Sequence, residues 1–287
     1  IEQNVKEYNL KSKIITILLI VSTGPAHHNY LSFQVNFIVL NCCLAYILFS
    51  NAKWFKSAGV IVAFGIWLKI YPILLLGLGI LYKKYRPSFY WALAFIVILP
   101  IIFAPIIPLE LYSYYILEIL PELGNTGSTS IQNQSMLASV ARQIMPIDGL
   151  RFDEFEVTFE LRVLSLIVAV SFCIAALIQR IRNGENVDNS LPLAVCAMTV
   201  MISAMSWSYS WVLAMPFLCY MYFYSQYPFI LLLCCMAYFL PGYSVLENII
   251  PYQSILGSVI YSRYSIAMTF LITLYFAMSL KTQSSEK

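Results

Sequence analysis

The sequence predicts an all-α integral membrane protein, a polytopic bundle of transmembrane helices. Its 287 residues are 60% hydrophobic and only 11% charged, whereas soluble domains carry about 25% charged residues. The stretch 189–246 contains no Asp, Glu, Lys or Arg, and at about 20 apolar residues per transmembrane helix it is long enough for three passes. The net charge of +3 is too small for binding to nucleic-acid phosphates. Composition therefore excludes soluble enzymes and nucleic-acid-binding proteins.

Apolar runs mark the candidate membrane segments of a single domain, 1–287. Their bounds are 14–23, 34–50, 57–68, 73–82, 88–107, 161–179, 190–207, 209–226, 228–242 and 263–280. Several early segments are short, and about 10–12 residues at 1.5 Å per residue cannot cross about 30 Å of hydrocarbon. These segments predict short re-entrant helices, which enter and leave the membrane on one side.

Basic residues fall in clusters between these segments, and the positive-inside rule places every cluster on the cytoplasmic side. The clusters are Lys11/Lys13, Lys53/Lys56, Lys83/Lys84/Arg86, Arg180/Arg182 and Lys281/Lys287. This placement requires 14–50 and 57–82 each to form a hairpin, the second turning at Lys69–Pro72. An uninterrupted span through Lys69 is the competing interpretation. We expect a multi-pass protein of the cell or plasma membrane.

One long polar region, 108–160, is expected to form a large extracytoplasmic loop. It holds eight of the 14 acidic residues. Its centre, Gly124–Ser130, has the composition of a flexible turn. Residues 133–145 follow with helical periodicity, and Ser135, Ser139 and Arg142 share the polar face. This pattern predicts an amphipathic helix that lies in the membrane interface.

Lys69 is the strongest single candidate for a binding residue. It lies near the middle of an otherwise apolar run, and a lone ammonium at the bilayer centre costs about 2.5–3.5 kcal/mol. Pro72 is suited to begin a new half-helix, whose N-terminus would bind an anion together with Lys69. The alternative is a lysine that reaches the interface or pairs internally.

Four further residues are candidate substrate ligands, each with an ordinary structural alternative. Arg142 can hold a lipid phosphate through paired hydrogen bonds, or it can anchor the interfacial helix to headgroups. Gln34 and Asn36 can bind sugar hydroxyls or join helices. Trp207 can stack on a sugar or belong to an interfacial aromatic belt.

Two other groups of residues are better explained as ordinary structure. His27 and His28 could exchange protons near neutral pH, but two histidines in an exposed turn more often have no catalytic role. The run Arg151–Glu156 is acidic enough for a metal, although a solvated surface explains it as well. We expect no metal and no cofactor.

Four short motifs follow one another in the order of a known family. Phe33-Gln34-Val35-Asn36 is similar to a G-Q-x-N element, Lys69-Ile70-Tyr71-Pro72 to a K-x-x-P helix, Asn133-Gln134-Ser135-Met136 with Arg142 to an N-Q-S-x loop, and Ser206-Trp207 to an S-W element. From about Leu31 to Trp211, the sequence therefore resembles the GT-C glycosyltransferases. It specifically resembles glycosyltransferase family 87, the polyprenol-phosphate-mannose-dependent alpha-mannosyltransferases.

The resemblance implies a GT-C helical bundle with short non-spanning helices. It also implies transfer of a hexose, with mannose expected, from a polyprenyl-phosphate sugar donor to a lipid or glycan acceptor at the outer face. Cations would stabilise the charge of the leaving phosphate. The substrate-binding residues implied in this way are Lys69, Arg142, Gln34, Asn36, Gln134, Ser135 and Trp207.

The sequence also departs from the family pattern. GT-C enzymes take their catalytic base, an Asp or Glu, from the first outer loop. Here we expect this carboxylate upstream of Ile1, in a chain truncated at its N-terminus; the alternative is an inactive homologue. Phe33 replaces the glycine of G-Q-x-N, and Tyr209 and Ser210 stand where a histidine is expected.

Two alternative functions remain open. A membrane polysaccharide polymerase or ligase also combines many helices with one large outer loop, but it should concentrate its essential arginines in that loop. A secondary transporter could use Lys69 and the broken helix as an anion site, but it should show two symmetric halves, and the sequence contains no internal repeat.

Overall fold

The protein is described here from a computed structural model. The structure describes residues 25–26, 34–128, 130, 133–144, 154–184, 190–203, 206–224, 260 and 262–281. Within these ranges the chain is mostly helical, with one two-stranded sheet. The expected segments 14–23 and 228–242, and the histidines at 27 and 28, lie outside the described residues.

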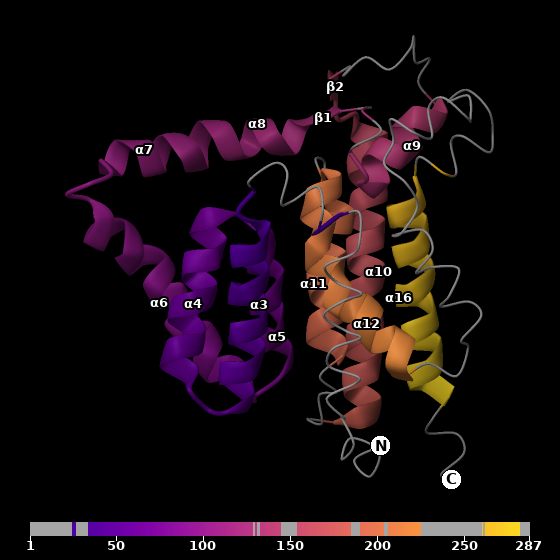
Figure 1. Cartoon of the computed structure of the whole chain (residues 1–287), viewed down its shortest axis with the longest axis horizontal. Helices are drawn as coiled ribbons and strands as arrows, with labels where there is room; N and C mark the ends of the chain where they lie inside the picture. The colour runs from indigo at the N-terminus through magenta and orange to yellow at the C-terminus, as the bar shows by residue number, and fades with distance from the viewer. Residues whose placement is uncertain are drawn as a thin grey trace.

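The first half of the chain forms one group of short helices (Figure 1). Its elements are α3 (Asn36–Asn51), α4 (Phe55–Leu68), the 3-10 helix η2 (Tyr71–Leu76), α5 (Gly77–Leu81) and α6 (Arg86–Phe103). Gly59 lets α4 approach α6 closely, because a Cβ atom there would lie 2.4 Å from Cβ of Trp91. Close backbone contact of this kind is typical of helices packed within membranes.

The chain breaks at the predicted turn between α4 and η2. Lys69 follows the last residue of α4 with an extended backbone, at φ −161° and ψ 131°, and Pro72 lies in the first turn of η2. The helices before and after this hairpin are joined near its two ends, because the Ser50 hydroxyl of α3 donates to the Ser88 hydroxyl of α6 at 2.8 Å. The structure therefore has a hairpin here and no uninterrupted helix through Lys69.

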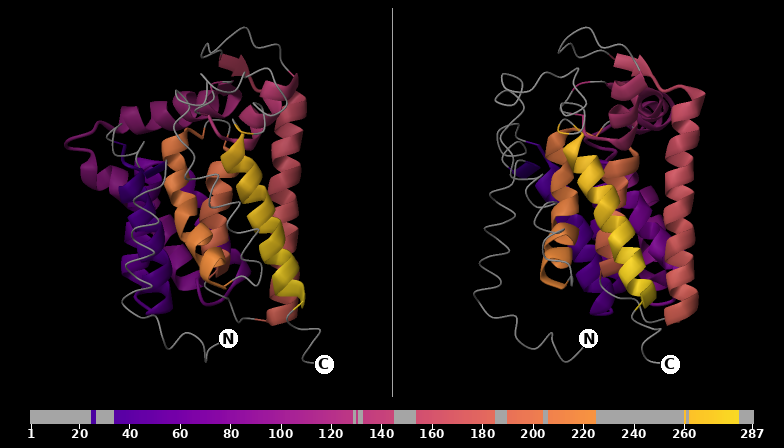
Figure 2. Two further views of the ribbon diagram at one scale, coloured as in Figure 1. Left: turned by 45° about the vertical axis from the view of Figure 1, so that its right-hand side comes forward. Right: turned by 90° about the vertical axis from the view of Figure 1, so that its right-hand side faces the viewer.

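The second group of helices comes from the C-terminal half. Its elements are α10 (Phe159–Asn183), α11 (Ser190–Ile202), the 3-10 helix η4 (Ser208–Ala214), α12 (Met215–Tyr224) and α16 (Arg263–Lys281). Buried polar contacts join three of them, because Gln179 Nε2 and Ser190 Oγ donate to the Tyr275 hydroxyl oxygen at 2.7 and 3.1 Å. Figure 2 shows α10 along one edge of the molecule.

Two of the described helices are long and apolar enough to cross a membrane. They are Arg86–Phe103 and Phe159–Arg182, and few of their residues are buried, 17% in the first and 11% in the second. Several other apolar helices within the described ranges, among them Asn36–Asn51, Phe55–Leu68 and Ser190–Ile202, are 10–17 residues long, which is at or below the shortest length that spans a bilayer; α16 has 19 residues. The additional passes expected from the sequence stay a prediction.

The basic clusters of both halves lie at the same end of the molecule. Lys56 Nζ is 5.7 Å from the centre of the Trp91 ring. Arg180 Cζ, near the end of α10, is 5.8 Å from the centre of the Tyr82 ring at the end of α5. These contacts agree with the placement of 53–56, 83–86 and 180–182 on one side, as the charge pattern predicted.

The region 109–125 is helical, although the sequence analysis treated it as loop. It contains α7 (Leu109–Tyr114), a π-helical segment η3 (Tyr115–Ile119) and α8 (Leu120–Asn125). Figure 1 shows these elements across the top of the first helical group, with α8 ending beside β1. Pro121 is tolerated because it lies in the first turn of α8, where its missing N–H costs little.

A small sheet and a short helix complete this upper layer. Strand β1 (Thr126–Ser128) pairs antiparallel with β2 (Glu154–Glu156), so the expected flexible turn at Gly124–Ser130 is in part a strand. Helix α9 (Met136–Ile144) lies within the expected helix 133–145. It packs on α10, α11 and α16.

Candidate functional site

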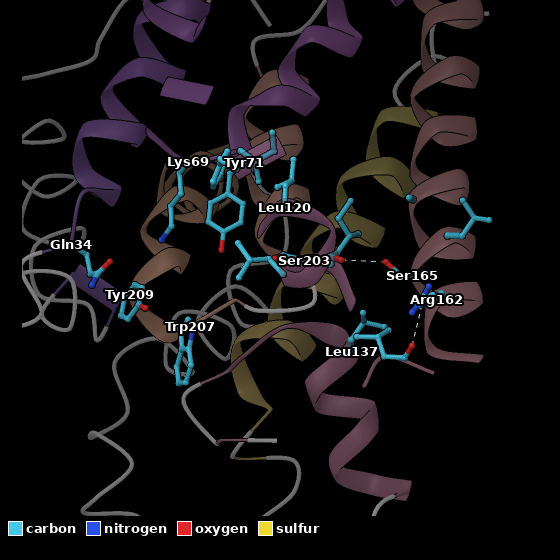
Figure 3. Close-up of a pocket in the computed structure, with 18 residues that line it drawn as sticks. Gln34, Lys69, Tyr71, Leu120, Leu137, Arg162, Ser165, Ser203, Trp207 and Tyr209 are labelled. Carbon is cyan, nitrogen blue, oxygen red and sulfur yellow. Dashed lines mark hydrogen bonds between the residues drawn. The ribbon is translucent and has the colours of Figure 1, made fainter. Parts of the chain in front are cut away.

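A cavity of about 700 Å³ is lined by residues from both helical groups and from the upper layer. The turn between α4 and η2 contributes Lys69 and Tyr71, while Trp207 and Tyr209 come from the start of η4. Helix α10 contributes residues at 162, 165, 166 and 169, which share one face because three to four residues make one turn. Figure 3 shows these side chains around the cavity.

Lys69 is held by polar and aromatic contacts at one end of this cavity. Its Nζ donates to Asn36 Oδ1 at 2.9 Å and lies 5.3 Å from the ring centres of both Tyr71 and Tyr209. Lys69 belongs to neither helix that is long enough to span a membrane, and burial lowers its pKa to about 8. It is therefore predominantly charged at neutral pH.

The aromatic side of the cavity lies next to Lys69. The Trp207 and Tyr209 rings are stacked, with centroids 6.5 Å apart and planes 16° from parallel. Gln34 lines the same end of the cavity. Stacked rings beside a hydrogen-bonding side chain offer both an apolar face and polar contacts to a bound sugar.

Arg162 was missed by the sequence analysis but lines the other end of the cavity. Its Nε donates to the Val157 carbonyl oxygen at 3.0 Å, and Figure 3 shows it far from Lys69 across the view. The sequence could have indicated Arg162 only as an arginine at the outer end of the expected span 161–179. Nothing in the local pattern indicated that this end faces a cavity.

The N-Q-S loop and the S-W element, which begin 73 residues apart in sequence, are joined in space. Asn133 Oδ1 accepts the backbone N–H of Ser206 at 2.9 Å, and the Gln134 N–H donates to the Ser206 carbonyl oxygen at 2.7 Å. Asn133 also forms an isolated β-bridge with Trp207. The loop thereby fixes the backbone that places Trp207 in the cavity.

Arg142 supports this loop from behind and does not line the cavity. Its side chain is 6% exposed, and Nη1 donates to the carbonyl oxygens of Ser130 and Asn133 at 3.0 and 2.7 Å. Nη2 donates to the hydroxyls of Ser139 and Ser262, both at 3.2 Å. The structure therefore does not bring Arg142 and Lys69 together at one binding site.

The other predicted ligands also fall into two groups, residues that line the cavity and buried residues that bond to other protein groups. Gln134 is buried, and its Oε1 accepts the backbone N–H of Tyr264 at 3.3 Å. Ser135 is buried as the cap of α9, since its Oγ accepts the N–H of Ala138 at 3.0 Å. Asn36 is buried behind Lys69. Of the seven predicted residues, the cavity is lined by Lys69, Gln34 and Trp207.

The polar face of α9 meets other protein groups. The Ser139 hydroxyl lies 2.8 Å from that of Ser265 on α16, and Arg142 bonds the loop as described above. The helical periodicity predicted from the sequence is present, but the polar side chains contact neighbouring segments. The place of α9 in a membrane interface stays a prediction.

Comparison with family models matches residues 5–206 to glycosyltransferase family 87. The chain belongs to glycosyltransferase family 87. Membership implies that the protein is a glycosyltransferase, which uses a sugar donor and an acceptor. No curated protein and no solved structure matches the chain.

The part of the chain matched to family 87 contains most of the site. It includes Lys69, Arg142 and Arg162, and it ends at Ser206, immediately before Trp207. In the part of the chain that the structure describes, the residues that line the cavity include neither Asp nor Glu. Within the described ranges no group of three or more His, Cys, Asp and Glu side chains could hold a metal, while 151–153 of the acidic run lie outside them.

Proposed function

We propose that this family 87 enzyme transfers a hexose, expected to be mannose, from a polyprenyl-phosphate sugar to a lipid or glycan acceptor at the extracytoplasmic face. We further propose that its bundle is of GT-C type. The observation that carries the proposal is Lys69, a cation in a 700 Å³ cavity whose ammonium contacts one amide oxygen and two tyrosine rings.

The contacts of Lys69 suit a leaving group that is a phosphate. When the bond between the sugar and the phosphate breaks, negative charge grows on the phosphate, and a fixed cation stabilises that charge more than it stabilises the intact donor. Asn36 accepts one of the three N–H groups of Lys69, which fixes the position of the ammonium. The two tyrosine rings favour the charged form through their negative faces.

The sugar is proposed to lie against Trp207 and Tyr209. Their stacked rings present an apolar surface to the C–H groups of a hexose, and Gln34 can bind its hydroxyls. Arg142, Gln134 and Ser135 act in this proposal by holding the loop that positions Trp207, because their hydrogen bonds are to protein groups.

The lipid chain of the donor is proposed to follow α10. Leu166 and Ala169 line the cavity on the same face of α10 as Arg162, and Leu166 is 62% exposed. Leu120 and Leu123 of α8 lie over the same region of the cavity. A long apolar chain that leaves along these side chains would remain in the hydrocarbon of the membrane.

The catalytic base is proposed to be an Asp or Glu outside the described cavity lining. Transfer to a hydroxyl requires a group that accepts its proton, and a carboxylate is the expected group. The lining residues that the structure describes offer cations and hydroxyls but no carboxylate. The described site is therefore proposed to bind and orient the donor.

Reconstituted protein tests the proposal directly. In nanodiscs, radiolabelled sugar should be transferred from polyprenyl-phosphate mannose but not from the nucleotide sugar GDP-mannose. Lys69→Gln should abolish transfer, whereas Lys84→Gln, the same change on an exposed lysine at the opposite end, should not. Transfer from the nucleotide sugar, or full activity of Lys69→Gln, would contradict the proposal.

A further inference from the structure

Arg162 is a second cation of the cavity, and its terminal nitrogens are available to a ligand. It lies in the first turn of α10, where Nε donates to the Val157 carbonyl oxygen at 3.0 Å. This bond fixes the direction of the guanidinium group. Arg162 makes no other hydrogen bond or ion pair with the part of the chain that the structure describes.

Among the described residues, the two positive charges of the cavity lining have no negative partner there. Lys69 and Arg162 line opposite ends of it, and the described lining contains neither Asp nor Glu. Two like charges around one cavity repel each other and raise the local concentration of anions. The arrangement favours two separate anionic groups as ligands.

The donor accounts for only one of these groups. A polyprenyl-phosphate sugar carries a single phosphate, which Lys69 is proposed to bind, with the sugar beside Trp207 and Tyr209. The lipid chain of the donor is proposed to pass Leu166 and Ala169, which lie one and two turns further along α10 than Arg162, so the end of the cavity at Arg162 is left for the second substrate. Resting on the proposed function, we infer that the acceptor carries an acidic group, a phosphate or a carboxylate, and that Arg162 binds it.

The surroundings of Arg162 suit this role. A guanidinium group binds the two oxygens of a phosphate or carboxylate with parallel hydrogen bonds, which a neutral hydroxyl cannot form. Val157 and Leu137, 2% and 3% exposed, form apolar walls beside it. Arg162 itself is exposed, so its guanidinium group is accessible to a ligand that enters the cavity. The Ser165 hydroxyl, one turn further on, already donates to the Ile202 carbonyl oxygen at 3.2 Å.

Binding of small sugars isolates the contribution of Arg162. The full chain carrying Lys69→Gln, in phosphatidylcholine nanodiscs, retains Arg162 as the cation of the described lining. Methyl α-mannoside 6-phosphate should bind to it about tenfold more tightly than methyl α-mannoside, as a charged hydrogen-bonded pair predicts. The two methyl glucosides are measured in parallel, so that the sugar identity does not decide the result.

Adding Arg162→Gln should remove the preference for the phosphorylated sugars. The matched control adds Arg182→Gln, an exposed arginine at the other end of α10, and should keep the preference. Equal binding of charged and neutral sugars by the Lys69→Gln protein would overturn the inference. A preference that survives Arg162→Gln would overturn it as well.

A lipid headgroup could supply the same phosphate chemistry, and a second arm separates the two sources. Binding is repeated in nanodiscs that contain phosphatidylglycerol. A preference that persists supports a soluble acidic group of the acceptor, whereas its loss would assign Arg162 to headgroups and overturn the inference.

Kinetics then separate the inference from the proposed function. With polyprenyl-phosphate mannose as donor, Arg162→Gln should raise the KM of a phosphorylated mannoside acceptor and leave the donor KM unchanged. A raised donor KM alone would place Arg162 at the donor and contradict the inference. If Lys69→Gln does not change transfer from the donor, the proposed function is contradicted. The binding comparison with the small sugars would still decide whether Arg162 binds an acidic group.

Discussion

Two basic side chains of this enzyme, Lys69 and Arg142, have opposite relations to the protein around them. Lys69 lines a cavity and makes one hydrogen bond, to Asn36. Arg142 is buried away from the cavity and makes at least four, two of them to backbone carbonyl oxygens. A cation that binds main-chain oxygens stabilises a loop, whereas one that faces a cavity is available to an anion.

The largest difference should appear in catalysis. We expect Lys69→Ala to reduce sugar transfer about 10²–10³-fold, because a fixed donor of positive charge at the leaving group is lost. Folding should change little, since the side chain faces a cavity. Transfer assays and thermal unfolding of the same sample check both statements, and a large fall in Tm would mean that Lys69 is structural.

Arg142→Ala should show the reverse pattern. Removal of the guanidinium leaves buried carbonyl oxygens of Ser130 and Asn133 without these donors, and we expect a loss of about 3 kcal/mol in the free energy of unfolding. Unfolding in detergent measures this change, with Arg182→Ala as an exposed control. Normal stability with weakened donor binding would instead make Arg142 a ligand of the donor phosphate.

The pH dependence of donor binding should follow Lys69. Burial lowers its pKa to about 8, so the ammonium is charged below this pH and loses its charge as the pH rises through it. Donor affinity should therefore decline above about pH 8, with about a tenfold loss of the charged form per further pH unit.

Lys69→Arg is the matched variant for this titration. Guanidinium stays charged to above about pH 12, so the decline of donor affinity at alkaline pH should disappear even if affinity at neutral pH is reduced. The donor KM is measured across the pH range for both proteins. An unchanged decline in Lys69→Arg would assign the titration to another group.

The smallest effect is expected for the aromatic side of the cavity. Trp207→Ala should weaken sugar binding about fivefold, the size of about 1 kcal/mol of aromatic contact. Trp54→Ala, at a tryptophan that is 62% exposed, is the control. If Trp207→Ala lowers stability as strongly as Arg142→Ala, then Trp207 belongs to the loop scaffold and not to the sugar site.

Local chemistry made part of the structure predictable. The turn at Lys69–Pro72 follows from a charge and a proline within an apolar run, and both signals act over a few residues. Helix α9 follows from periodicity in the same way. The helices at 109–125 were missed because their acidic residues indicated loop, although their apolar residues also have helical spacing.

The site was less predictable, because it depends on contacts between distant segments. Tyr209 was noted only as a departure from the family pattern, yet its ring centre lies 5.3 Å from Lys69 Nζ. The partners of Arg142 include Ser262, 120 residues away. An isolated sequence shows that a cation is present, but not whether its donors meet carbonyl oxygens or a cavity.

The hairpin that carries Lys69 has a consequence for how the position of this lysine can vary with the lengths of the hairpin arms. Its two arms, α4 and η2–α5, begin and end at the same end of the molecule. Lengthening or shortening both arms would move the lysine along the bundle axis without reversing the direction of any later helix. The depth of the charge is therefore adjustable independently of the orientation of the remaining chain, which would allow related enzymes to accommodate headgroups of different size.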